Sequence, residues 1–124
     1  MKVADLKIVL AVDDDKAILN ILREQLDRAG YAVITEATGK RAIEIVGHTQ
    51  LLAVLLDLGL GDMAGFEVLE RIKALKPALP VIIVTGSHDE SEARRVFALG
   101  AYDYVTKPID FKYLENILLL HSSP

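Results

Sequence analysis

Five apolar runs rich in β-branched residues alternate along this chain with segments of helical spacing. We expect strands at residues 8–12, 32–35, 51–56, 81–85 and 102–105, each followed by a helix. The central runs are nearly free of polar residues, as in parallel strands that are covered on both faces. Strict alternation of strand and helix therefore predicts an α/β fold, with a doubly wound, five-stranded parallel sheet.

The helical segments each place apolar residues on one face. The residues expected to face the core are Ile18, Ile21, Leu22 and Leu26 in the first helix, Ala42, Ile43 and Val46 in the second, Phe66, Leu69 and Ile72 in the third, Ala93, Val96 and Phe97 in the fourth, and Phe111, Leu114, Ile117 and Leu118 in the fifth. Asp15 and Asp110 are expected to cap the first and fifth helices, and Ser87 with Glu90 has capping-box spacing before the fourth.

Length and composition restrict the class of protein. At 124 residues we expect a single domain over residues 1–124, with its core at about 7–121. A net charge of -4 and no cluster of Lys and Arg argue against direct nucleic-acid binding. The absence of cysteine excludes disulfides and thiolate chemistry and fits a cytoplasmic protein. The longest apolar run, residues 51–56, is too short to span a membrane, and no signal peptide is expected.

Polar residues gather where the expected strands end. The first strand is followed by Asp13, Asp14 and Asp15, the third by Asp57, the fourth ends at Thr85, and Lys107 follows the fifth. Parallel strands bring their carboxyl ends to one edge of the sheet, where such folds bind ligands. Carboxylates gathered there repel one another unless a hard divalent cation lies among them, and Mg²⁺ is the natural candidate.

Four stretches carry a resemblance to a known family: VDDD at 12–15, LLDLGLGDMAGFEVLERIK at 55–73, VIIVTG at 81–86 and YVTKP at 104–108. In this order and spacing they resemble the CheY-like receiver domain of bacterial two-component response regulators. The resemblance covers essentially the whole chain. It implies a flavodoxin-like three-layer sandwich with strand order 2-1-3-4-5, which sets the first and third strands side by side.

The resemblance also implies roles for the residues at that edge. Asp57 would be the phosphoacceptor, taking a phosphoryl group from the phosphohistidine of a sensor histidine kinase or phosphotransfer protein. Asp14 and Asp57, with the backbone carbonyl of Gly59, would hold Mg²⁺, and Asp13 would act through a bound water. Lys107 and Thr85 would contact the phosphoryl oxygens. The domain would then catalyse its own phosphorylation and dephosphorylation rather than act as an enzyme on another substrate.

A switch is implied as well. Phosphorylation would draw Thr85 inward, and Tyr104 would swing into the vacated space. The fourth helix, fifth strand and fifth helix would form the readout face for a downstream effector or output domain. Leu119 and Leu120 fall off the core-facing side of the fifth helix, where they mark either a partner or homodimer surface or terminal packing.

Gly61 stands where the family usually has proline four residues after the phosphoacceptor, so we expect a looser loop. Three alternatives stay open. The stretch GLGDMA at 59–64 matches a dinucleotide-binding fingerprint, although Thr85 stands where an acidic residue is expected. Asp13 and Asp15 could form the D-x-D pair of an aspartate-nucleophile phosphatase, which leaves Asp57 unexplained. The third alternative is a receiver-like interaction module that is not phosphorylated.

Overall fold

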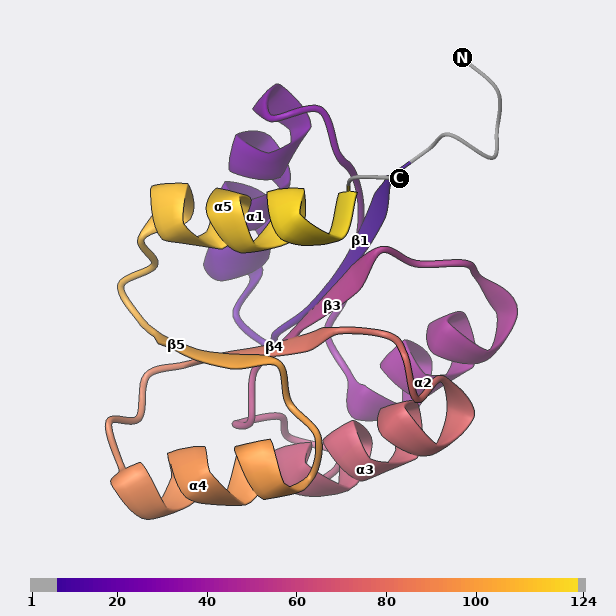
Figure 1. Ribbon diagram of the computed structural model, residues 1–124, viewed down its shortest axis with the longest axis vertical. Helices are drawn as coiled ribbons and strands as arrows, with labels where there is room; N and C mark the ends of the chain where they lie inside the picture. Colours follow the sequence, from indigo (N-terminus) through magenta and orange to yellow (C-terminus); the bar gives the residue numbers. More distant parts are fainter. Residues whose placement is uncertain (1–6, 123–124) are drawn as a thin grey trace.

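A computed structural model describes residues 7–122; residues 1–6 and 123–124 of the expected domain lie outside this range. Strands and helices alternate as predicted (Figure 1). The strands are β1 (Ile8–Val12), β2 (Ala32–Glu36), β3 (Ala53–Leu56), β4 (Val81–Thr85) and β5 (Asp103–Thr106). The helices are α1 (Lys16–Arg28), α2 (Gly39–His48), α3 (Gly65–Leu75), α4 (Glu90–Ala98) and α5 (Phe111–Ser122). All strand pairs are parallel in the order β2-β1-β3-β4-β5, which confirms the predicted fold.

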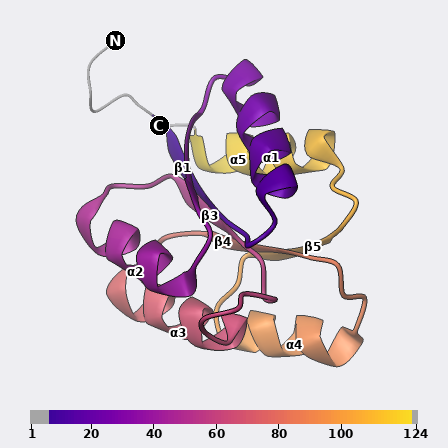
Figure 2. The same cartoon turned by 180° about the vertical axis from the view of Figure 1, so that it is seen from behind.

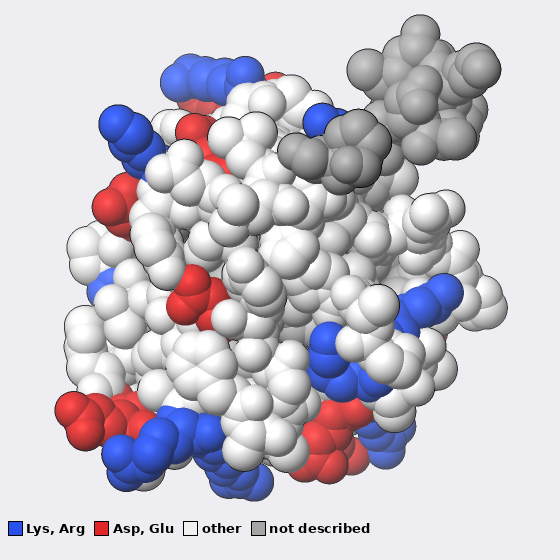
Figure 3. Space-filling view, viewed as in Figure 1, with Lys and Arg blue, Asp and Glu red and all other residues white. Residues whose placement is uncertain are grey.

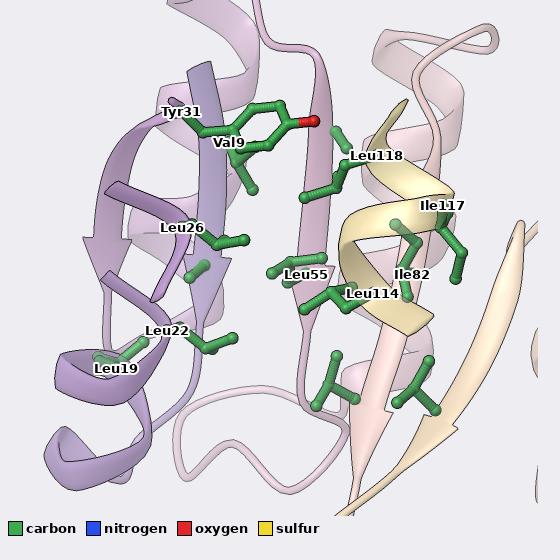
Figure 4. Close-up of a cluster of buried hydrophobic side chains, with 14 residues drawn as sticks. Val9, Leu19, Leu22, Leu26, Tyr31, Leu55, Ile82, Leu114, Ile117 and Leu118 are labelled. Atoms are coloured by element: carbon green, nitrogen blue, oxygen red, sulfur yellow. The ribbon is translucent and has the colours of Figure 1, made fainter. Parts of the chain in front are cut away.

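The sheet is covered on both faces. Helices α1 and α5 lie on one face, and α2, α3 and α4 lie on the other (Figures 1 and 2). Alternate residues of each strand therefore enter one of two apolar clusters. Figure 4 shows the first, in which Leu22 and Leu26 of α1 and Leu114 of α5 converge on Leu55 of β3. Burial on both faces explains why the central strands are uninterrupted apolar runs.

The register of β1 and β3 brings two acidic residues together. Val12 and Leu56 are paired as the last residues of their strands, so Asp13 and Asp57 both follow directly at the same edge. The backbone N–H of Asp57 donates to the carbonyl of Val12 at 2.9 Å, which extends the ladder by one step. The strand order and this register together place the two residues next to each other.

Two helix faces differ from the prediction. On α1, Ile21 is 44% exposed, whereas Leu19 is buried at 7%. On α4, Phe97 is 48% exposed and Val96 is the buried residue. Successive helical residues are about 100° apart, so Ile21 and Phe97 each lie that far from the buried neighbours Leu22 and Val96. The packing of α1 and α4 on the sheet therefore leaves Ile21 and Phe97 at the edge of the buried face.

Smaller corrections concern the ends of elements. Residues 51 and 52 lie before β3, and β5 begins at Asp103 rather than at residue 102. Asp15 caps α1 as expected, but Asp89, not Ser87, caps α4 by accepting from the N–H of Ser91 at 2.8 Å. Within residues 7–122, no helix combines the length and apolarity needed to cross a membrane.

Candidate phosphoryl-transfer and metal site

Three carboxylates meet at the carboxyl ends of β1 and β3. Asp13 and Asp57 are buried, at 2% and 7% exposure, and Asp14 is exposed. Each of the three offers an oxygen that lies within 4.8 Å of the oxygens of the other two. Asp13, Asp14 and Asp57 therefore lie together at one edge of the sheet, as the sequence predicts. Asp15 is turned into the cap of α1 instead, where it accepts from the N–H of Ala17.

Lys107 brings a positive charge to the same place from the end of β5. Its ammonium donates to Oδ2 of Asp13 at 2.8 Å and lies 3.5 Å from Oδ2 of Asp57. Its backbone N–H donates to the carbonyl of Thr85, which fixes the residue against β4, and the Lys107–Pro108 peptide bond is cis. One ammonium faces three carboxylates, so the site retains net negative charge when all four groups are ionised.

Burial and neighbouring charge set the protonation of the site. Burial raises the pKa of Asp57; a hydrogen bond from the N–H of Gly59 opposes this shift, and the negative charge of Asp13 adds to it. Burial on its own would lower the pKa of Lys107, but the hydrogen bond to Asp13 and the charge of Asp57 outweigh it and raise that pKa. Lys107 therefore stays charged at neutral pH. For ionised Asp57, the favourable interactions with Lys107 and Gly59 do not fully offset the cost of burial.

The site fits a divalent cation in its donor set. Two buried carboxylates and one exposed carboxylate are hard oxygen donors of the kind that Mg²⁺ and Ca²⁺ select. Lys107 brings one positive charge to these three carboxylates, so a divalent cation would supply the positive charge that is still missing when all are ionised. Asp13, Asp14 and Asp57 can therefore hold a metal ion.

Gly59 lies two residues after Asp57, on the exposed loop between β3 and α3. Its N–H donates to Oδ1 of Asp57 at 3.2 Å, so one carboxylate oxygen is held by the loop while the other faces Lys107. A Cβ at Gly59 would lie 3.8 Å from the Asp57 carboxylate, an ordinary contact distance. A side chain at this position would thus border the carboxylate directly.

Thr85 and Tyr104 occupy the neighbouring strand ends. Thr85 is buried, and its hydroxyl accepts from the N–H of Ser87 at 3.4 Å. Tyr104 packs against the apolar cluster beneath α4, and its hydroxyl lies 2.9 Å from both the carbonyl of Ser87 and Oε1 of Glu92. Tyr104 therefore links β5 to the loop that begins at Thr85. No sequence motif singles out Glu92, which lies one helical turn before Val96 and so on the same face of α4.

The sequence of this chain is similar to a known protein family and to curated relatives. Residues 9–119 match the family described as response regulator receiver domain. The transcriptional regulatory protein ZraR of Escherichia coli K12 is 38% identical over 110 residues, which are 89% of this chain but 25% of that protein. The chain thus spans about a quarter of that relative's length.

Solved structures of response regulators superpose closely on this fold. A CheY-like receiver domain protein from Methanospirillum hungatei superposes with a TM-score of 0.87 at 31% identity, covering 94% of this chain and 96% of that one. A response regulator from Burkholderia pseudomallei, solved with a phosphorylated aspartic acid, a calcium ion and citrate, has a TM-score of 0.85 at 25% identity and covers 94% of this chain and 68% of that one.

Proposed function

Because the chain belongs to the response regulator receiver domain family, which supplies the phosphoacceptor of two-component signalling, we propose that Asp57 is the residue that accepts the phosphoryl group. The observation that supports this choice most strongly is the position of Asp57. Its carboxylate directly follows the central strand β3, with one oxygen held by Gly59 and the other facing Lys107. The donor is the phosphohistidine of a sensor histidine kinase or phosphotransfer protein, and the exchange takes place in the cytoplasm.

In the proposed transfer, a carboxylate oxygen of Asp57 attacks the phosphorus of the phosphohistidine. The phosphorus–nitrogen bond breaks, its electron pair stays on the imidazole nitrogen, and an acyl phosphate forms on Asp57. This chemistry depends on positioning and charge neutralisation more than on acid or base catalysis. The ammonium of Lys107 lies within reach of the Asp57 carboxylate to stabilise the transferred oxygens, and the hydroxyl of Thr85 supplies a hydrogen-bond donor at the same edge.

The metal in this proposal is Mg²⁺. Asp13, Asp14 and Asp57, together with the carbonyl of Gly59, would hold it, with Asp13 acting through a water. Bound there, Mg²⁺ would neutralise charge on the phosphoryl oxygens. Hydrolysis of the acyl phosphate by water returns the Asp57 carboxylate and inorganic phosphate. The domain thus catalyses its own phosphorylation and dephosphorylation as a phosphoryl acceptor.

The signal leaves the site through Tyr104 and the surface formed by α4, β5 and α5. A phosphoryl group on Asp57 draws Thr85 toward its oxygens and favours the inward position of Tyr104, in which the hydroxyl reaches Ser87 and Glu92. Figure 3 shows few charged residues over β4 and β5 on this side of the molecule. Leu119 and Leu120 of α5 are 58% and 71% exposed. This surface is where a downstream effector, an output domain or a second copy would bind.

The proposal is tested with a small phosphodonor. The protein is incubated with acetyl phosphate, with and without Mg²⁺, and its intact mass is measured beside that of Asp57→Asn. We expect one added phosphoryl group on the wild type with Mg²⁺, and none on the variant or without metal. An equal adduct on Asp57→Asn would contradict the assignment. If no adduct forms, and a beryllofluoride mimic also fails to bind, the chain would be an interaction module that is not phosphorylated.

A further inference from the structure

The loop between β3 and α3 is tied to another helix by Asp62. Oδ1 of Asp62 accepts from the N–H of Gly39 at 2.9 Å, and Oδ2 accepts from the N–H of Lys40 at 3.0 Å. Gly39 and Lys40 are the first two residues of α2, so both donors are groups that lack a partner within the helix. These two bonds are the main reason that the pKa of Asp62 lies below its usual value. Asp62 is therefore ionised and bonded through both oxygens at neutral pH.

The start of α2, which donates these two hydrogen bonds to Asp62, is packed tightly against α3. A Cβ on Gly39 would lie 2.5 Å from Cγ2 of Val68 on α3 and 3.4 Å from Met63. The start of α2 therefore packs on α3 at a separation that only glycine allows. Because Gly39 and Val68 are both buried, the start of α2 is anchored in the core at Gly39, while Lys40, the second donor, lies at the surface.

Besides Asp62, the loop is held by Leu60 and Met63, which are partly buried against the apolar cluster that lies beneath α2, α3 and α4. The loop begins at Asp57 and ends at Gly65, where α3 starts against the backbone of Leu58. Between these ends stands Gly61, where a Cβ would meet nothing within 4 Å. Proline at this position would restrict the backbone through its ring, and glycine does not. The expected looseness at Gly61 is thus countered one residue later, where the carboxylate of Asp62 fastens the loop to α2.

We propose that Asp62 is a positioning residue for the site at Asp57: by fastening the loop to α2, it holds Gly59 where its carbonyl can serve as a metal ligand. This inference rests on the proposed function, because Gly59 matters only if the site holds Mg²⁺. Asp62 is not one of the three carboxylates that could hold the metal, so its role would be to position the loop. Groups that orient metal ligands in this way typically change metal affinity by about tenfold or more when they are removed.

The test compares Asp62→Ala with two other variants of the same region. Asp62→Asn removes the charge but keeps one acceptor oxygen. Thr38→Ala removes the N-cap of α2, whose hydroxyl accepts from the N–H of Arg41 at 3.2 Å, and leaves the tie to the loop intact. For each protein we would measure the dissociation constant of Mg²⁺ by calorimetry, the urea midpoint, and hydrogen exchange at the Gly39 and Lys40 amides.

We expect Asp62→Ala to weaken Mg²⁺ binding by about tenfold, Asp62→Asn to weaken it less, and Thr38→Ala to bind within about twofold of wild type. Both alanine variants should lower the urea midpoint, because each removes hydrogen bonds from the start of α2. Equal weakening by Asp62→Asn and Asp62→Ala would overturn the proposal, since charge alone would then act. Equal weakening by Thr38→Ala, or no weakening by Asp62→Ala, would also overturn it.

The same measurements separate this inference from the proposed function. If the wild type binds Mg²⁺ but gives no adduct with acetyl phosphate, the proposed phosphorylation fails while weakened Mg²⁺ binding by Asp62→Ala still supports the positioning role. If the wild type gives a Mg²⁺-dependent adduct and Asp62→Ala binds the metal normally, only the positioning role fails. A wild type that binds no Mg²⁺ overturns both.

Discussion

The ammonium of Lys107 donates a 2.8 Å hydrogen bond to Asp13, a residue 94 positions away in the chain. The bond joins the end of β5 to the end of β1 across the carboxylate of Asp57, which directly follows β3, the strand between β1 and β4. Lys107 therefore supplies the positive charge for two buried carboxylates at once. Stability in the absence of metal and reactivity in its presence should both depend on this one side chain.

Replacing Lys107 with methionine should destabilise the metal-free protein by about 1–2 kcal/mol, because Asp13 and Asp57 lose their charged partner while staying buried. Mg²⁺ should recover part of the loss by supplying positive charge to the same carboxylates. Urea unfolding in EDTA and in Mg²⁺ measures both effects. Lys112→Met, on the exposed side of α5, is the matched control and should change stability by less than about 0.5 kcal/mol. If Lys107→Met and Lys112→Met lowered stability equally, Lys107 would not be the charged partner that stabilises Asp13 and Asp57.

Asp57→Asn should make the metal-free protein more stable, and the gain should grow with pH. Burial, together with the charge of Asp13, raises the pKa of Asp57 in the folded protein above 3.8, so the folded state binds the proton more tightly than the unfolded chain. Wild-type stability therefore falls as pH rises from about 3.8 through the folded pKa, by about 1.4 kcal/mol for each unit between the two values.

Asparagine at position 57 does not titrate, so the variant does not lose this stability as pH rises. Urea unfolding in EDTA at a series of pH values should give curves for wild type and Asp57→Asn that converge in acid and separate toward neutral pH. Curves that separate toward acid instead would mean that the carboxylate is stabilised by folding.

Tyr104→Phe should lower stability by about 0.5–1.5 kcal/mol, since the hydroxyl bonds to Ser87 and Glu92 are lost at a half-buried position. Chemical denaturation measures the change. Tyr102→Phe is the control, because Tyr102 is 45% exposed and its ring packs edge-on against His121. If both substitutions cost the same, the Tyr104 hydroxyl does not tie β5 to the loop before α4.

Gly65→Ala should destabilise the protein by about 1–3 kcal/mol. A Cβ at Gly65 would lie 2.7 Å from the carbonyl oxygen of Leu58, and this backbone neighbour cannot turn away as a side chain could. Because Leu58 follows Asp57, Mg²⁺ binding should weaken as well. Gly47→Ala makes no contact within 4 Å on α2 and should stabilise the protein by about 0.5–1 kcal/mol. If Gly65→Ala and Gly47→Ala stabilised the protein by similar amounts, α3 would not start against Leu58.

The alternation of apolar runs was sufficient to predict the sheet, because strands that are covered on both faces consist mostly of apolar residues. β1 and β4 begin and end where the sequence indicates. The strand ends likewise located Asp13, Asp57, Thr85 and Lys107 at one edge, since parallel strands share a direction. Their order across the sheet came from the family resemblance, and the structure confirms it.

Other features depend on tertiary contacts that no local pattern encodes. Leu19 and Ile21 are both apolar, and only the angle at which α1 packs decides that Leu19 is buried. Asp62 resembles any acidic loop residue until α2 places two free N–H groups beside it. Glu92 is an exposed helix residue by sequence, and its bond to Tyr104 requires the packing of α4 against β5.

Identifying the phosphorylated side chain tests the role of Asp57 most directly. The protein is treated with acetyl phosphate and Mg²⁺ and then with borohydride, which reduces an acyl phosphate to an alcohol and so converts phosphoaspartate to homoserine. Peptide mass spectrometry then locates the homoserine. We predict homoserine at position 57 and aspartate at positions 13 and 14. Homoserine at 13 or 14, with aspartate retained at 57, would contradict the proposal that Asp57 accepts the phosphoryl group.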